Sequence, residues 1–415
     1  MWWQVLYLFL VILCVNDFFY FGWWWHIEGQ FNIADVGNAL VWIGAVVMLI
    51  RRNNKEVLRN RFSILIVLYL GFLFIQIALS GLYYDQPLSQ AIIATRLQFY
   101  FASFFLFLLL LDSAFKIRRV LNTLTFLSVI ALLLGVVNYF GPTILSYKWV
   151  AHDIRSGITR AYIPGMAILS LAAIWEFSKW ISKPQNNILS GFCFFCLLGG
   201  HFFRQTRMSI LGLIIVVFGL LIVTRRIKLL IFCLCISTGA VALCELSLPE
   251  NIILSPFVTT IQNVRQTSGT WKERTEQMKV DFEQFLKHPV IGSGATSLRK
   301  ALYQATTRTP REAKLYQIAY KADLGYVHWL KAYGVIGIVW LLLFFWFFWN
   351  GSWRLMRQKN DENRDIKLFL LGYATFIVIT CVTLNYMMYA SRIVMVCLLA
   401  AIIIRTERFS SNAQK

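Results

Sequence analysis

Long runs of apolar residues, separated by short polar stretches, make up most of the chain. A helix that crosses about 30 Å of hydrocarbon needs about twenty mostly apolar residues, and the chain contains about twelve runs of that kind. The most clearly bounded runs are 2–20, 34–50, 62–84, 92–112 and 120–140. The pattern predicts an all-α polytopic membrane protein with about twelve transmembrane helices.

The apolar runs divide the chain into three regions. Residues 1–246 hold the first nine predicted helices, and residues 323–415 hold the last three. Residues 247–322 between them are mostly polar and form one large loop, between the ninth and tenth helices. A loop of this length is usually functional or partly folded. Within it, 272–287 carries apolar residues at a helical spacing (Met278, Phe282 and Phe285), which predicts an amphipathic helix that lies against the membrane face.

Clusters of basic residues follow alternate runs and set the expected orientation of the chain. They occur at 51–55, 116–119, 225–228 and 354–367. Such clusters mark cytoplasmic loops of membrane proteins. The pattern therefore places both termini in the cytoplasm and the 247–322 loop on the external face of the membrane.

Composition supports the membrane assignment and removes one other class. The chain is 58% hydrophobic and only 14% charged, whereas ordinary soluble domains are about 25% charged. The formal net charge of +20 could indicate nucleic-acid binding. The basic residues lie in short clusters between apolar runs, however, so we expect a lipid bilayer and no nucleic acid as the partner.

The sequence lacks the usual motifs of nucleotide and metal chemistry. It contains no glycine-rich nucleotide loop, no His-Glu-x-x-His and no paired aspartates of a metal-dependent site. We therefore expect no metal and no cofactor. Basic residues near the external membrane surface are the remaining candidates: Arg155, Arg160, Arg204, Arg207 and Arg274. Their guanidinium groups either reach for lipid headgroups or bind a lipid-linked diphosphate, whose oxygens match the guanidinium fork. A helical spacing of three would put Arg204 and Arg207 on one face.

Two short glycine motifs frame the end of the large loop. The first is His288-Pro-x-Ile-Gly-x-Gly294, with Arg274 ahead of it. The second begins at Gly325-Tyr326 and continues to Tyr-Gly-x-x-Gly337 in the tenth apolar run. In their order, spacing and membrane setting, these motifs resemble the O-antigen ligase and polymerase superfamily of bacterial envelope glycan assembly. The resemblance covers about 150 residues directly, from Arg204 onward, and the layout of the rest of the chain agrees with it.

The resemblance implies a membrane glycosyltransferase of the bacterial inner membrane. Such an enzyme transfers or polymerises glycan repeat units from an undecaprenyl diphosphate carrier on the periplasmic face, by an inverting displacement without a metal. The implied partners are the undecaprenyl diphosphate-linked oligosaccharide, an acceptor glycan or lipid A-core, and flippase and chain-length regulator proteins. Four arginines, Arg160, Arg204, Arg207 and Arg274, would hold the diphosphate.

Asp323 and His328 are the candidates for the general base that deprotonates the acceptor hydroxyl. Asp323 also suits an N-cap immediately before an apolar helix. It occupies the position at which ligase-like members carry their histidine, so the sequence favours a repeat-unit polymerase over a ligase that attaches O-antigen to lipid A-core. His328 lies about 140° farther round the helix, and is either a second candidate base or an interface histidine. Tyr326 and Tyr333 could stack on an acceptor sugar or belong to the interfacial aromatic belt.

One alternative of a different class stays open. A transporter or flippase could bind the same lipid-linked sugar without making bonds, with the arginines as its translocation site. Transporters more often place charged or Gly/Pro-broken helices near the membrane midplane. The conspicuous feature here is instead the external loop, which favours the enzyme.

Overall fold

The computed structural model describes most of the apolar runs and part of the large loop. The described residues are 2–15, 33–52, 59–84, 87–140, 152–155, 158–161, 168–204, 207–229, 231–235, 269–294, 325–358, 363–382 and 389–412, together with Val57, Gly165, Gly239 and Met387. Most of the predicted ninth helix and most of the 247–322 loop lie outside these residues, so their prediction stays a prediction.

Helices account for nearly all of the described elements. They are α1 (Trp2–Val15), α2 (Ile33–Arg52), α4 (Arg61–Tyr84), α5 (Leu88–Thr95), the 3-10 helix η1 (Arg96–Ala102), α6 (Ser103–Leu110), α7 (Ala114–Phe140), α8 (Leu169–Ser182), α9 (Ile188–Arg204), α10 (Arg207–Val223), α13 (Gly269–Lys287), α16 (Gly325–Arg357), α17 (Arg364–Thr380) and α18 (Ala390–Asn412). The predicted 92–112 helix is in fact three pieces, α5, η1 and α6, which follow one another without a gap.

The described residues bear out the all-α prediction, apart from one short hairpin. Two short antiparallel strands, β1 (His152–Arg155) and β2 (Ile158–Ala161), form a hairpin between α7 and α8. The other described elements are helical, as expected of a multi-pass membrane protein. Among the described residues, four stretches are long and apolar enough to cross a membrane, namely Arg61–Leu82, Leu88–Leu110, Ala114–Val137 and Gly325–Arg357, and four shorter apolar helices accompany them.

The centre of the bundle is formed by helices that are apolar all round. Every residue of α6 is buried, and so is every residue of α18 from Ile393 to Ile404. Helices of this kind are stable only when neighbours enclose them, and α6 and α18 pack against each other. The outer helices instead expose apolar side chains, such as Leu68 on α4 and Trp346 on α16, which are 62% and 60% exposed. These are the surfaces that lipid would cover.

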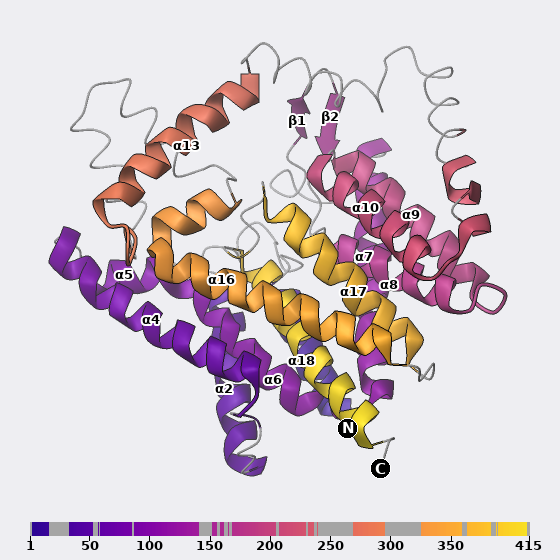
Figure 1. Ribbon diagram of the computed structural model, residues 1–415, viewed down its shortest axis with the longest axis horizontal. Helices are drawn as coiled ribbons and strands as arrows, with labels where there is room; N and C mark the ends of the chain where they lie inside the picture. Colours follow the sequence, from indigo (N-terminus) through magenta and orange to yellow (C-terminus); the bar gives the residue numbers. More distant parts are fainter. Residues whose placement is uncertain are drawn as a thin grey trace.

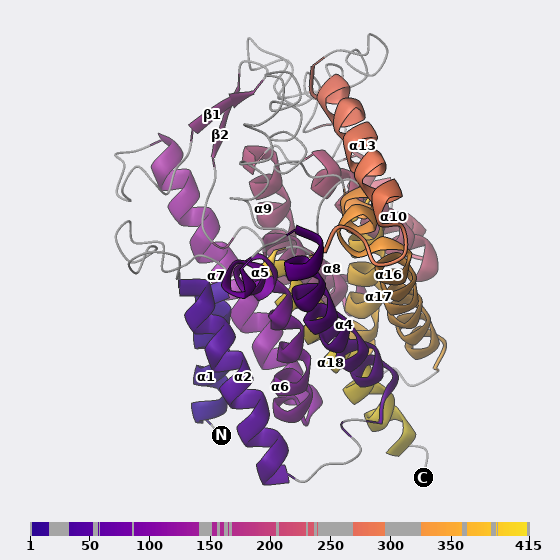
Figure 2. The same cartoon turned by 90° about the vertical axis from the view of Figure 1, so that its left-hand side faces the viewer.

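The two ends of the bundle differ. Figures 1 and 2 show α13 and the β1–β2 hairpin at one end, and the first turn of α1 and the last turn of α18 at the opposite end. α13 packs against α16 and rises above it at the edge of the bundle (Figure 1). The helix predicted at 272–287 is thereby confirmed, with boundaries at Gly269 and Lys287.

Helix α16 is broken at Gly334, and the segment after α13 fills the break. Gly334 has φ 63° and ψ −161°, a conformation that is essentially restricted to glycine. A break leaves backbone N–H and C=O groups without helical partners. Four hydrogen bonds from or to the 289–294 segment satisfy them. The N–H groups of Ser293 and Gly294 donate to the carbonyls of Lys331 (2.8 Å) and Ala332 (3.1 Å). The N–H groups of Val335 and Ile336 donate to the carbonyls of Pro289 (2.9 Å) and Val290 (3.2 Å).

The two glycine motifs of the sequence are therefore the two halves of one backbone contact, which we call the α13–α16 junction (289–294 with 331–336). Side chains would not fit within it. A Cβ atom on Gly334 would lie 2.4 Å from the carbonyl oxygen of Val290, and one on Gly292 would lie 2.5 Å from that of Ala332. The glycines thus permit the close approach as well as the backbone angles.

We expect Gly334→Ala to destabilise the protein. The strained backbone angles alone cost about 1–3 kcal/mol, and the contact with Val290 adds to this cost. Gly219→Ala is the matched control, because a Cβ atom on this glycine of α10 meets nothing within 4 Å. Thermal unfolding in detergent should show a lower midpoint for Gly334→Ala and no loss for Gly219→Ala. Equal midpoints for the two variants would mean that the junction tolerates a side chain.

Candidate functional site

The face of α13 that meets α16 is polar. Gln277 is 1% exposed and Asp281 is fully buried. The apolar residues of the same helix point the other way, since Met278 is 43% and Phe282 50% exposed. A surface helix of a soluble protein has the opposite arrangement. The polar face of α13 is therefore turned towards α16 and the interior of the protein. Its apolar side chains are exposed, where lipid could contact them.

A buried ion pair joins α13 to the N-terminal half of α16. The Lys331 ammonium donates to Oδ1 of Asp281 at 2.8 Å, and the Lys331 side chain is 11% exposed. His328, one turn earlier on α16, places its Nδ1 3.6 Å from Oδ2 of Asp281. Charged groups at membrane level are costly unless they are paired or functional. The Asp281 carboxylate thus meets two groups that can carry positive charge.

A cluster of buried aromatic rings supports this half of α16. Trp329 and Trp340 are stacked with ring centroids 6.0 Å apart, and Tyr69 of α4 stacks on Trp340 at 4.3 Å. The Trp329 indole N–H donates to the Gly337 carbonyl at 2.8 Å. Tyr333 is 5% exposed within this cluster. The suggestion that Tyr333 stacks on a sugar is therefore wrong for this structure, because neighbouring rings already cover it.

The first turn of α16 is held against the end of α17. Gly325 has φ 44°, and a Cβ atom there would lie 1.9 Å from the Cys381 carbonyl oxygen. The Tyr326 hydroxyl donates to the carbonyl of Val378 at 3.2 Å. The hydroxyl hydrogen of Tyr326 is therefore used within the protein. Asp323, two residues before Gly325, lies outside the described residues.

The candidate arginines lie on five different elements, of which β1 carries Arg155 as its last residue. Arg274 is on α13, seven residues before Asp281, so the two share a helical face. Arg160 is in β2, opposite Asp153 in the hairpin register. Arg204 is the last residue of α9 and Arg207 the first of α10. The expectation that a helical spacing puts these two on one face is therefore wrong, since they belong to different helices.

Some of these polar groups could have been found from the sequence and others could not. Lys331 is a basic residue inside an apolar run, which marks it as a candidate by itself. Nothing in the sequence pairs it with Asp281, fifty residues earlier. His201 of α9 is another buried polar residue, and one of its ring nitrogens lies 3.3 Å from the Ser170 hydroxyl of α8. Among the described residues, no three His, Cys, Asp or Glu side chains come together as metal ligands.

The comparison with known families coincides with these elements. Residues 192–342 match the family model described as O-antigen ligase. The matched range contains most of α9, all of α10 and α13, and the part of α16 that holds the break and Lys331. No curated protein gave a significant match to the chain. The family match confirms the resemblance carried by the two glycine motifs and assigns residues 192–342 to the O-antigen ligase and polymerase superfamily.

Proposed function

We propose that this protein is a membrane glycosyltransferase that polymerises glycan repeat units carried on undecaprenyl diphosphate. The observation that carries the proposal is the polar face of α13, which runs from Arg274 to the buried Asp281 and is fixed to a broken membrane helix by the α13–α16 junction. This face lies within the range that matches O-antigen ligase. It gives a lipid-linked substrate a polar surface next to its apolar anchor.

The proposed reaction is a displacement at the anomeric carbon of the donor sugar. The acceptor hydroxyl oxygen forms the new glycosidic bond, and the bond from the anomeric carbon to the diphosphate breaks with its electron pair staying on the diphosphate. Arg274, with Arg204, Arg207 and Arg160 from the other elements, would hold and stabilise that leaving group. Asp323 would take the hydroxyl proton. His328 is the second candidate for this role, and the ring of Tyr326 would contact the acceptor.

The proposed location is the bacterial inner membrane, with about twelve spans and both termini in the cytoplasm. The end of the bundle that carries α13 and the β1–β2 hairpin would then face the periplasm, where lipid-linked repeat units become available after a flippase has moved them. The first turn of α1 and the last turn of α18 lie at the opposite end (Figure 2), which supports this orientation. Chain-length regulators would be further partners on the periplasmic side.

The first alternative is an O-antigen ligase, which would use the same donor and transfer to lipid A-core. Asp323 at the histidine position of ligase-like members favours the polymerase. The second alternative is a transporter of lipid-linked sugars, which would need no base at all.

Purified protein in liposomes separates the three possibilities. With undecaprenyl diphosphate-linked repeat units as the only substrate and no nucleotide, a polymerase produces longer glycans. A ligase produces a new product only when lipid A-core is added. A transporter moves the donor between leaflets and leaves its length unchanged. The proposal fails if the donor is intact after incubation both with and without lipid A-core.

Arg274→Lys tests the proposed diphosphate contact. A lysine keeps the charge but cannot form the two parallel hydrogen bonds of a guanidinium on phosphate, so we expect transfer to fall about tenfold. Arg354→Lys is the matched control, because Arg354 is exposed near the end of α16 and its guanidinium donates to Asn350 at 3.2 Å. Rates of glycan transfer should separate the two variants. Normal transfer by Arg274→Lys would reassign this arginine to headgroup contact.

A further inference from the structure

A shallow basic pocket lies where α10 ends, far from the site described above. It is lined by residues 225–229, which follow α10, by Phe232, and by Pro184 from the turn between α8 and α9. α10 is 17 residues long and starts at Arg207, so the pocket lies about 25 Å along the helix from that arginine. This distance is close to the thickness of a membrane core. The pocket therefore sits at the opposite membrane surface from Arg207.

The backbone of the turn determines how the pocket is built. The N–H of Arg226 donates to the Leu221 carbonyl at 3.0 Å, and that of Arg225 donates to the Ile222 carbonyl, also at 3.0 Å. This pair of bonds is a Schellman motif, which needs a left-handed residue just after the helix. Arg225 takes that position, with φ 55°, although glycine is the usual residue there. The reversal sends successive side chains in different directions.

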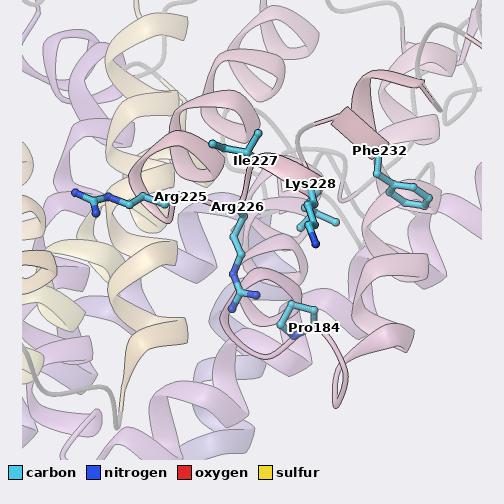
Figure 3. Close-up of a pocket in the computed structure, with 7 residues that line it drawn as sticks. Pro184, Arg225, Arg226, Ile227, Lys228 and Phe232 are labelled. Atoms are coloured by element: carbon cyan, nitrogen blue, oxygen red, sulfur yellow. The ribbon is translucent and has the colours of Figure 1, made fainter.

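Figure 3 shows the result of this reversal. The side chains of Arg226 and Lys228 extend to the same side, towards Pro184, while the side chain of Arg225 extends away from them. Among the described residues, no carboxylate forms an ion pair with Arg226 or Lys228, and no acidic residue lines the pocket. Two cationic groups therefore converge without a counter-charge from the part of the chain that the structure describes.

Apolar side chains surround the two cations. Ile227 and Phe232 line the pocket and are 65% and 49% exposed, and Ile222, in the last turn of α10, is 66% exposed. A small inorganic anion would leave these side chains in water. A ligand with a negative headgroup and hydrocarbon chains would satisfy both parts of the surface, because basic pockets between membrane helices suit acidic lipid headgroups.

We propose that this pocket binds the headgroup of an anionic phospholipid. The Arg226 guanidinium contacts the phosphate oxygens as a fork, and the Lys228 ammonium contacts them as a point charge. Ile222, Ile227 and Phe232 contact the first carbons of the acyl chains. The site is independent of glycan transfer, since it lies at the other membrane surface from the proposed diphosphate contacts.

Lipid retention by purified protein tests the proposal, and Arg225 supplies a matched control. Delipidated protein in detergent is titrated with phosphatidylglycerol, and bound lipid is counted by native mass spectrometry. Arg226→Gln and Arg225→Gln remove the same charge from adjacent residues. We expect about tenfold weaker binding of one phosphatidylglycerol for Arg226→Gln, and wild-type binding for Arg225→Gln. Lys228→Gln, which changes an exposed side chain, should also weaken binding of phosphatidylglycerol. It provides a second test if Arg226→Gln folds poorly.

Two further titrations identify the source of the phosphate. Phosphatidylethanolamine, which has no net charge, should bind much more weakly than phosphatidylglycerol. Inorganic phosphate at millimolar concentration should not displace the bound lipid. The proposal is overturned if the two arginine variants lose lipid equally, which would indicate a diffuse surface charge. It is also overturned if the zwitterionic lipid binds equally well or if inorganic phosphate displaces the lipid.

Discussion

An Asp323→Asn protein is expected to transfer glycan at least about a hundred times more slowly than the wild type, because general-base catalysis contributes roughly 10²- to 10⁴-fold. Asparagine cannot take the proton of the acceptor hydroxyl. It can still accept a backbone hydrogen bond as an N-cap, so the protein should insert in the membrane and fold normally. Donor binding should be retained, since the proposed diphosphate contacts are arginines. Single-turnover transfer together with donor binding measures both effects.

His328→Gln is the control for this experiment. His328 lies next to the buried Asp281, and glutamine is a polar replacement of similar reach, so its effect should be the milder one. The opposite result, near-normal transfer by Asp323→Asn and none by His328→Gln, would make Asp323 a cap and His328 the base. The argument against a histidine-based ligase would then lose its support.

Replacing Asp281 alone by Leu is expected to destabilise the protein by about 3–5 kcal/mol, because it leaves the Lys331 ammonium buried without a partner. Lys331→Met, made alone, leaves the Asp281 carboxylate with only His328 nearby. The double variant Asp281→Leu/Lys331→Met removes both charges. It should recover much of the loss, since a well-packed apolar pair often replaces a buried ion pair at little cost.

Thermal unfolding in detergent and limited proteolysis near α13 measure these differences. The expected order of stability is wild type and double variant above either single variant. If the double variant loses as much as the sum of the two single variants, the two charges do not interact. The 2.8 Å contact between them would then make no contribution to the docking of α13 on α16.

The sequence predicted individual helices better than the contacts between them. The spacing of Met278 and Phe282 predicted α13 almost to its ends, because helical periodicity is a local property. The sequence did not predict which face of α13 is buried. The buried face carries Gln277 and Asp281, and Asp281 pairs with Lys331, which is distant in the chain. The two glycine motifs were recognised as a pair. Their actual role, four backbone hydrogen bonds across a broken helix, follows only from the fold.

Local signals also failed in two places. The spacing of Arg204 and Arg207 suggested one helix face, but each residue belongs to a different helix. The β1–β2 hairpin lies in a short polar stretch between apolar runs. Each strand has only four residues, and an alternation of that length is too short to distinguish a strand from a loop.

The α13–α16 junction also bears on how chains of this kind can diverge. Its hydrogen bonds join backbone groups at 289–294 to backbone groups at 331–336, so both ends of the intervening segment are tied at one place. The entropy of closing such a segment grows only with the logarithm of its length, and doubling the length costs about 0.6 kcal/mol. Insertions and deletions within 295–322, ahead of Asp323 and the first turn of α16, should therefore be tolerated, whereas the two motifs and residues 323–330 should not change. A new acceptor could be accommodated by lengthening or replacing 295–322 while the helices around it keep their positions.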